Sequence, residues 1–193
     1  MHFLALNAKL VSMLTYEPIG LDLSLTSTGV AIGRATWAIA TKGLRGEERL
    51  IYIRDLILEA ISDLEPEPDN QFVVFVEGYS FASRNSHAHA LGELGGVIRV
   101  ALHEAEIPFV EVPPTCRAKF ATGKGNASKS EVVSAISART SLIWDGPGNE
   151  DRCDAWILQE MGRTILGQST ITWPTKHLEA LQKLDLSSII TPE

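Results

Sequence analysis

Four carboxylates stand within or beside apolar segments of this chain, where an acid is costly to bury without compensation. Asp22 lies inside the apolar segment 19–23, and Glu77 directly follows the apolar residues 72–76. Asp151 and Asp154 open another apolar segment with an i,i+3 spacing, which places both on one face of a helix. Hard divalent cations such as Mg²⁺ prefer oxygen ligands and compensate such acids. The four acids therefore predict a metal-dependent enzyme that acts on phosphate esters.

Each acid considered alone has a local structural explanation of varying strength. Asp22 could cap a turn, as aspartate often does before serine or threonine. Asp151 could be an acid favoured by the dipole at a helix N-terminus. Glu77 and Asp154 are harder to explain in this way. Together, two strand acids and a helical pair could surround two metal ions about 4 Å apart.

The hydrophobic pattern predicts an α/β fold, in which helices flank a mixed central sheet of about five strands. We expect strands at residues 18–25, 28–32, 36–41, 71–76 and 109–112, and helices at 47–64, 86–106, 115–121, 128–140 and 149–166. The continuous apolar segment 71–76 is typical of a central strand covered on both faces. Ser128 and Glu131 have the spacing of a capping box. The tail predicts one weakly amphipathic helix around residues 175–186.

The composition fits one well-packed domain, since the chain has 193 residues of which 45% are hydrophobic. Cys116 and Cys153 lie far apart, which indicates reduced thiols in a cytoplasmic protein. No segment has the roughly 18 apolar residues of a membrane span, and we find no secretory signal. We therefore expect no membrane partner.

Charge is distributed unevenly along the chain. A formal net charge of −7 argues mildly against nucleic-acid binding. Residues 113–130 nevertheless contain no acid and four bases, Arg117, Lys119, Lys124 and Lys129. This segment predicts a phosphate-binding face, with a solvated basic loop as the alternative.

Two other motifs are rejected. The segment 123–130 departs from a P-loop, because Ser128 replaces the second glycine and the loop follows a helix, not a strand. His87 and His89 are two residues apart, so they cannot share one helix face as zinc ligands.

Several segments in order resemble one known family. Gly20-Leu-Asp-Leu-Ser-Leu-Thr-Ser-Thr-Gly29 resembles the first-strand motif of the RuvC-type Holliday junction resolvases, in the RNase H-like superfamily. Segments 75–79, 84–85 and 90–97 are similar to that family's second acid and the helix after it. Segments 112–113 and 122–129, together with Lys119, resemble its basic DNA-contacting region, and residues 151–155 resemble its closing acidic pair. This resemblance divides the chain into an extension (1–16), an RNase H-like nuclease domain (17–166) and a tail (167–193).

The resemblance implies a structure-selective DNA endonuclease that cuts four-way junctions. Two Mg²⁺ ions per site, with Mn²⁺ as an expected substitute, would activate a water for in-line attack and stabilise the departing 3′ oxygen. Asp22 would bridge both ions, with Glu77 and Asp154 as further ligands. Asp151 would be a ligand or orient the water, and Lys129 would offset charge on the scissile phosphate.

The same reasoning predicts the contacts to branched DNA. Backbone phosphates would be contacted by the basic residues of segment 113–130 and by Arg84 and Asn85. Either Tyr79 or Phe81 qualifies as the aromatic expected after the second acid.

A homodimer is expected, with residues 86–106 near its two-fold axis, because a junction has two strands to cut. Gly92, Gly95 and Gly96 interrupt this helical pattern, and each costs about 1 kcal/mol relative to alanine. Close approach of a neighbouring helix would compensate, and tight packing on the chain's own sheet is the alternative.

Other functions stay open from the sequence. The chain could cut another branched DNA or an RNA–DNA hybrid, or bind junctions without cutting them. An ATP-binding domain related to actin and sugar kinases is less favoured, because those proteins need two such domains and a second phosphate loop.

Overall fold

A mixed five-stranded sheet forms the centre of the computed structural model, which describes residues 15–64, 70–78 and 86–189. The strands are β1 (Thr15–Asp22), β2 (Ser27–Ile32), β3 (Ala35–Ala40), β4 (Asn70–Glu77) and β5 (Phe109–Val112). Their order is β3-β2-β1-β4-β5; β1, β2 and β3 form an antiparallel meander, whereas β4 and β5 run parallel to β1. The predicted α/β fold with a mixed sheet of about five strands is confirmed.

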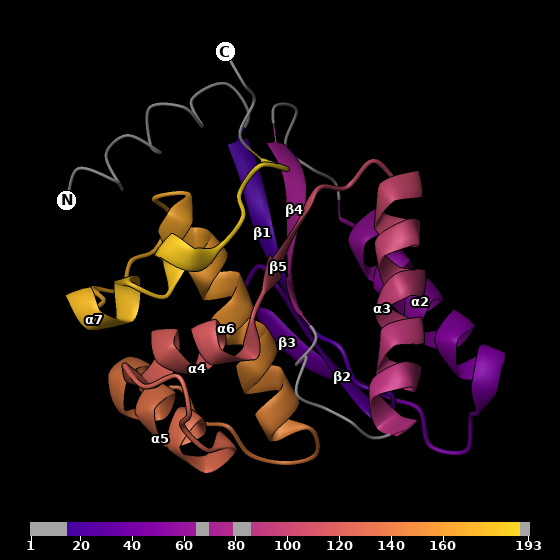
Figure 1. The fold of residues 1–193 in the computed structure, drawn as a ribbon, viewed down its shortest axis with the longest axis horizontal. Helices are drawn as coiled ribbons and strands as arrows, with labels where there is room; N and C mark the ends of the chain where they lie inside the picture. Colours follow the sequence, from indigo (N-terminus) through magenta and orange to yellow (C-terminus); the bar gives the residue numbers. More distant parts are fainter. Residues whose placement is uncertain (1–14, 65–69, 79–85, 190–193) are drawn as a thin grey trace.

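Helices cover both faces of the sheet (Figure 1). One face carries α2 (Gly46–Ser62) and α3 (Ser86–Glu104). The other carries α4 (Pro114–Thr122), α5 (Lys129–Thr140), α6 (Asn149–Ile165) and the short α7 (Thr175–Leu178). Within the described residues, no helix combines the length and the apolar character that a bilayer crossing requires.

Strand β4 contributes to a hydrophobic core on each side of the sheet. Val73 and Phe75 are buried in the core that includes α6, whereas Val74 and Val76 are buried in the core that includes α2 and α3. Successive side chains of a strand point to opposite faces, so a strand with helices on both sides is apolar throughout. The prediction of a central strand covered on both faces is confirmed.

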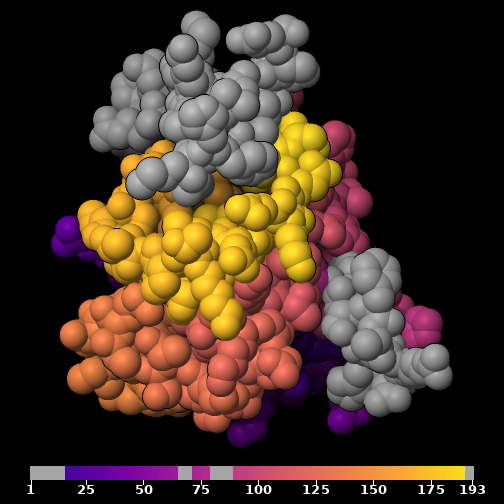
Figure 2. Space-filling model, turned by 60° about the vertical axis from the view of Figure 1, so that its left-hand side comes forward, coloured from indigo at the N-terminus to yellow at the C-terminus, as the bar shows by residue number. Residues whose placement is uncertain are grey.

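The tail after α6 packs against α4 and α6, and Figure 2 shows it spread over the face formed by these helices. The ring of Trp173 lies 4.2 Å from that of Phe120, centroid to centroid. Instead of one predicted helix at 175–186, the chain forms α7 and a separate 3₁₀ turn, Leu181–Lys183. A short, weakly amphipathic helix gains little by itself, so burial of Leu181, Leu186 and Ile189 decides the path of the tail.

Candidate metal centre

Three of the four predicted acids converge at one end of the sheet. Asp22 ends β1 and Glu77 ends β4, and because these neighbouring strands are parallel, both carboxylates reach the same edge. Asp154 joins them from the second turn of α6. One carboxylate oxygen from each residue lies within 4.8 Å of the other two. Such a group of oxygen donors could bind a hard divalent cation.

Two glycines allow α6 to approach the sheet closely enough for Asp154 to reach the other acids. A Cβ on Gly20 would lie 1.9 Å from the carbonyl oxygen of Ala155, and a Cβ on Gly29 would lie 2.0 Å from that of Asp151. Both distances are far below van der Waals contact. The backbone of α6 therefore packs directly against β1 and β2. Because Gly20 and Gly29 have no side chains, Asp154 can reach the other two acids.

Burial disfavours the charged forms of these acids. Desolvation raises the pKa of Asp22 well above its ordinary value, and Glu77 and Asp154 raise it further. Desolvation also raises the pKa of Asp154 to about 6, although the neighbouring Arg117 opposes this shift. A divalent cation bound among the acids would oppose both shifts, because it favours the charged carboxylates.

The donor set fits a divalent cation. Within the described residues, Oδ2 of Asp154 is buried and has no hydrogen-bond partner. A buried carboxylate oxygen without a partner is costly, and a cation bound between the acids would satisfy it. All three side chains offer the oxygen ligands that Mg²⁺ and Mn²⁺ accept.

Arg117 lies among the acids and is only 8% exposed. Its Nε donates to Oε2 of Glu77 at 3.0 Å and its Nη2 to Oε1 at 3.4 Å, while Nη1 donates to Oδ1 of Asp154. Burial lowers the pKa of Arg117, but the surrounding acids raise it by more. The sequence predicts Arg117 as a DNA contact, and the structure shows it in ion pairs inside the cluster.

A sequence signal for this placement exists. Arg117 is followed at i+3 and i+4 by Phe120 and Ala121, which are both buried. An arginine on the apolar face of a helix indicates a buried acidic partner, because an unpaired buried charge is strongly unfavourable.

Lys129 stands at the rim of the cluster, at the start of α5. Its Nζ lies 3.7 Å from Oδ1 of Asp151 and 3.9 Å from Oδ2 of Asp154. The predicted capping box of Ser128 and Glu131 is present and sets where α5 begins. Asp151 lies outside the group of three and is connected to it through Lys129, while the side chain of Lys129 remains 54% exposed.

Comparison with known proteins finds relatives of one kind. No family model matches the chain. It is 28% identical over 149 residues to the crossover junction endodeoxyribonuclease RuvC of Carboxydothermus hydrogenoformans, covering 77% of this chain and 90% of that relative. It is 29% identical over 146 residues to RuvC of Hydrogenovibrio crunogenus, covering 71% of this chain and 81% of the relative. The chain is thus similar to RuvC-type nucleases over most of its length.

Solved structures support the same fold. The structure of T. thermophilus RuvC in complex with a Holliday junction substrate matches with a TM-score of 0.59 and 23% identity, covering 80% of this chain and 98% of that one. A second Thermus thermophilus RuvC structure matches with a TM-score of 0.58. The RuvC resemblance and the RNase H-like fold expected from the sequence are thus confirmed.

The predicted basic segment, residues 113–130, is largely engaged in internal ion pairs. Besides Arg117 and Lys129, Lys119 pairs at 2.6 Å with Glu179 of the tail. Lys124 is exposed in the loop between α4 and α5, and among the described residues it has no ion pair within 4.0 Å. The roles of these four bases as DNA contacts stay predictions. The same holds for four residues that lie outside the described part of the chain: Tyr79, Phe81, Arg84 and Asn85.

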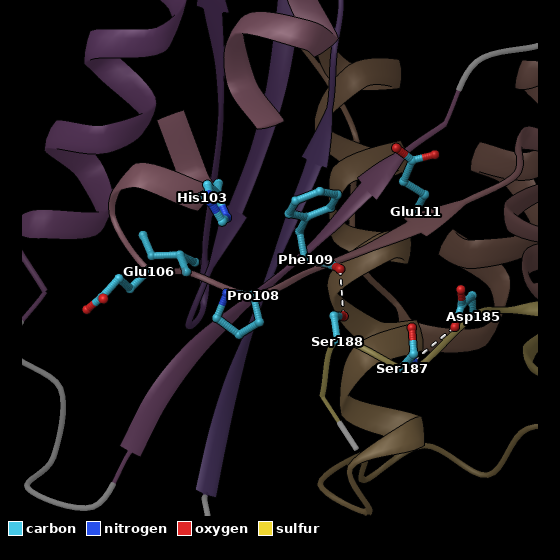
Figure 3. A pocket seen from close by; sticks show the side chains of 9 residues that line it. His103, Glu106, Pro108, Phe109, Glu111, Asp185, Ser187 and Ser188 are labelled. Atoms are coloured by element: carbon cyan, nitrogen blue, oxygen red, sulfur yellow. Dashed lines mark hydrogen bonds between the residues drawn. The ribbon is translucent and has the colours of Figure 1, made fainter. Parts of the chain in front are cut away.

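A separate cavity of about 680 Å³ lies where the tail meets the end of α3 and the start of β5 (Figure 3). His103, Phe109 and Asp185 are among its lining residues, and Oγ of Ser188 donates to the carbonyl of Phe109 at 2.7 Å. Its lining shares no residue with the acid cluster. The cavity therefore belongs to the contact between tail and sheet.

Proposed function

We propose that this RuvC-type chain is a metal-dependent, structure-selective DNA endonuclease that resolves four-way junctions by paired nicks. The observation that carries the proposal is the meeting of Asp22, Glu77 and Asp154 at one edge of the sheet. Their elements occur in the order expected of the family, on β1, β4 and α6. This activity corresponds to a crossover junction endodeoxyribonuclease, as the sequence relatives are named.

Two Mg²⁺ ions per site, or Mn²⁺ in their place, are the proposed cofactors. When bound, they would supply an activated water for in-line attack on the phosphorus and stabilisation of the departing 3′ oxygen. Asp22 is the proposed bridging ligand, because it ends the central strand β1 and has both Glu77 and Asp154 as neighbouring carboxylates. Asp151 is the proposed fourth acid, as a ligand or as the residue that orients the water.

Lys129, beside the acids, would offset negative charge on the scissile phosphate. The amino group of Lys129 lies within 3.9 Å of Asp154 while half of its side chain remains exposed, so it can contact an incoming phosphate without leaving the acids. Lys124, which is exposed in the adjacent loop, is the proposed contact to the flanking DNA backbone. Such phosphate contacts position the substrate and confer no sequence preference.

A homodimer is the proposed assembly, with α3 at the interface. Of the three glycines in this helix, Gly95 is buried, whereas a Cβ on Gly96 would meet no described atom within 4 Å. Val100, one turn after Gly96, is 58% exposed. A second copy of α3 would bury this face and present two active sites to the two strands that must be cut.

Light scattering tests the dimer. At tens of micromolar the unmodified chain should have the mass of a dimer, and Gly96→Gln should shift it to a monomer without an internal clash. Ala138→Gln, on the exposed surface of α5, is the matched control. A monomeric mass for the unmodified chain, with and without junction DNA, would contradict the dimer.

Cleavage of a labelled four-way junction tests the activity. Linear duplex and an RNA–DNA hybrid of the same sequence serve as comparison substrates, each with Mg²⁺, with Mn²⁺ and with EDTA. We expect paired nicks in the junction with either metal and none with EDTA. Preferential cleavage of the hybrid would favour a different nuclease activity of the same fold, and cleavage in EDTA would overturn the metal mechanism.

The proposed location is the cytoplasm. Cys116 and Cys153 are both buried free thiols, which accords with a reducing compartment.

A further inference from the structure

The guanidinium of Arg117 uses the same oxygens that the proposed metal ions would need. Both oxygens of Glu77 accept hydrogen bonds from it, and so does Oδ1 of Asp154. One carboxylate oxygen of Asp22 lies within 4.8 Å of an oxygen of each of these two acids. Among the three acids, Oδ2 of Asp154 is the buried oxygen left without a hydrogen bond in the described part of the chain.

A buried arginine is a permanent positive charge, since its guanidinium does not lose its proton in proteins. Arg117 therefore compensates part of the negative charge of three clustered carboxylates whenever no divalent ion is bound. Removing one partner of a buried ion pair is strongly destabilising, because the other partner is left buried and uncompensated. The folded state without metal thus depends on Arg117.

We propose that Arg117 is a resident cation of the acid cluster, which holds Glu77 and Asp154 in place and competes with a divalent ion for them. This inference rests on the proposed metal-dependent function. An ion can enter beside Asp22 and Oδ2 of Asp154 while Arg117 keeps its contacts. Ligation by Glu77 requires Arg117 to release it, so the two proposed ions bind with unequal affinity.

The consequence is a thermodynamic coupling between one side chain and the metal. An arginine that must give up hydrogen bonds weakens ion binding by the free energy of those bonds. Couplings of this kind typically change affinity by about 5- to 150-fold. Without Arg117, the divalent ion becomes the main source of positive charge in the cluster, and folding stability then depends on it.

The test compares the full-length wild type with Arg117→Gln, Arg117→Lys and Arg163→Gln. Arg163 is the matched control, because it pairs with buried Glu160 on the same helix as Asp154 but away from the cluster. Melting temperature is measured in EDTA and across a titration of Mg²⁺, and ion affinity is measured by calorimetry.

In EDTA, both glutamine variants should melt below the wild type. Mg²⁺ should raise the melting temperature of Arg117→Gln by clearly more than that of wild type or Arg163→Gln, and its affinity for Mg²⁺ should be at least about fivefold tighter. The Mg²⁺ affinity of Arg117→Lys should lie between those of wild type and Arg117→Gln, since lysine keeps the charge but loses the paired hydrogen bonds. If Arg117→Gln is unfolded in EDTA, recovery of its helical circular dichroism by Mg²⁺ supports the proposal.

Two results separate the possible failures. A wild type that cleaves junctions and binds Mg²⁺, with Arg117→Gln and Arg117→Lys no tighter than wild type, overturns the role of Arg117 alone. Absence of both Mg²⁺ binding and junction cleavage in wild type overturns the proposed function and this inference with it.

Discussion

Gly29 lies directly opposite Asp22 in the antiparallel ladder of β1 and β2. The carbonyl of Asp151 occupies the space that a side chain at Gly29 would fill. The strand pair β1 and β2, which carries Asp22, thus also packs against α6, the helix that carries Asp151 and Asp154. Placement of the metal centre therefore depends on the missing Cβ of Gly29, together with that of Gly20.

Gly29→Ala should destabilise the protein and strongly reduce cleavage, because its Cβ would lie 2.0 Å from the carbonyl oxygen of Asp151. Overpacking at such a site costs about 1–3 kcal/mol or more. Ala138→Ser, at an exposed position of α5, is the control and should change stability by less than about 0.5 kcal/mol. Chemical denaturation and junction cleavage measure the two effects. A Gly29→Ala variant of wild-type stability would contradict this packing.

Asp154→Asn and Glu77→Gln should each lower junction cleavage by more than about 100-fold, the upper end of what loss of a supporting second-shell group does. Junction binding should remain within a few-fold of wild type, since it depends on phosphate contacts outside the cluster. Gel-shift and single-turnover assays on the same junction separate the two properties. Near wild-type turnover in either variant would remove that residue from the metal site.

Lys124→Ala should weaken junction binding and lower the slope of log affinity against log salt by about 0.9, the value for one phosphate contact on B-form DNA. Lys119→Ala should have a smaller effect, because Lys119 already pairs with Glu179. Arg34→Ala, in the turn between β2 and β3 at the opposite end of the sheet from Asp22, is the control. An unchanged slope for Lys124→Ala would show that this loop does not touch the DNA.

Mild acid should loosen the tail through His177. Burial is the main cause of its lowered pKa, and the ring meets the carbonyl of Phe120 at 2.7 Å. Below pH 6.5 the unfolded chain takes up a proton that the folded chain excludes. The contribution of His177 to the free energy of unfolding is therefore fully present above pH 6.5. It decreases as pH falls toward the lowered folded-state pKa, by at most about 1.4 kcal/mol per pH unit.

Urea denaturation between pH 7.5 and 5 measures this slope. His177→Gln should lose part of the pH dependence, whereas His103→Gln, at the exposed end of α3, should retain it. Equal slopes in wild type and His177→Gln would contradict a titrating role for His177.

Much of the fold and two of the acids follow from local patterns in the sequence. The period-2 and period-3.6 apolar patterns indicate which segments are strands and which are helices. Asp22 and Glu77 each end an apolar strand, and neighbouring parallel strands bring their carboxyl ends together. The i,i+3 spacing of Asp151 and Asp154 indicates one helix face. These properties depend on neighbours in sequence, so they can be read without the tertiary structure.

The destinations of the basic side chains could not be read in this way. Arg117 meets Glu77 across 40 residues and Asp154 across 37, and Lys119 meets Glu179 across 60. A long, flexible cation can point to solvent, to DNA or to a buried acid, and its helix sequence alone does not select among them. The packing of α4 between α6 and the tail makes Glu77 and Asp154 the nearest partners of Arg117.

The available chemistry, carboxylates on core elements and a local excess of positive charge, follows from the sequence alone. The tertiary structure decided which acids meet and which bases remain exposed. Gly20 and Gly29 allow α6 to pack closely on the sheet. Glu179 of the tail forms an ion pair with Lys119. The physical reason is that burial and ion pairing depend on contacts between residues distant in sequence, whereas strand and helix formation depend largely on residues close together.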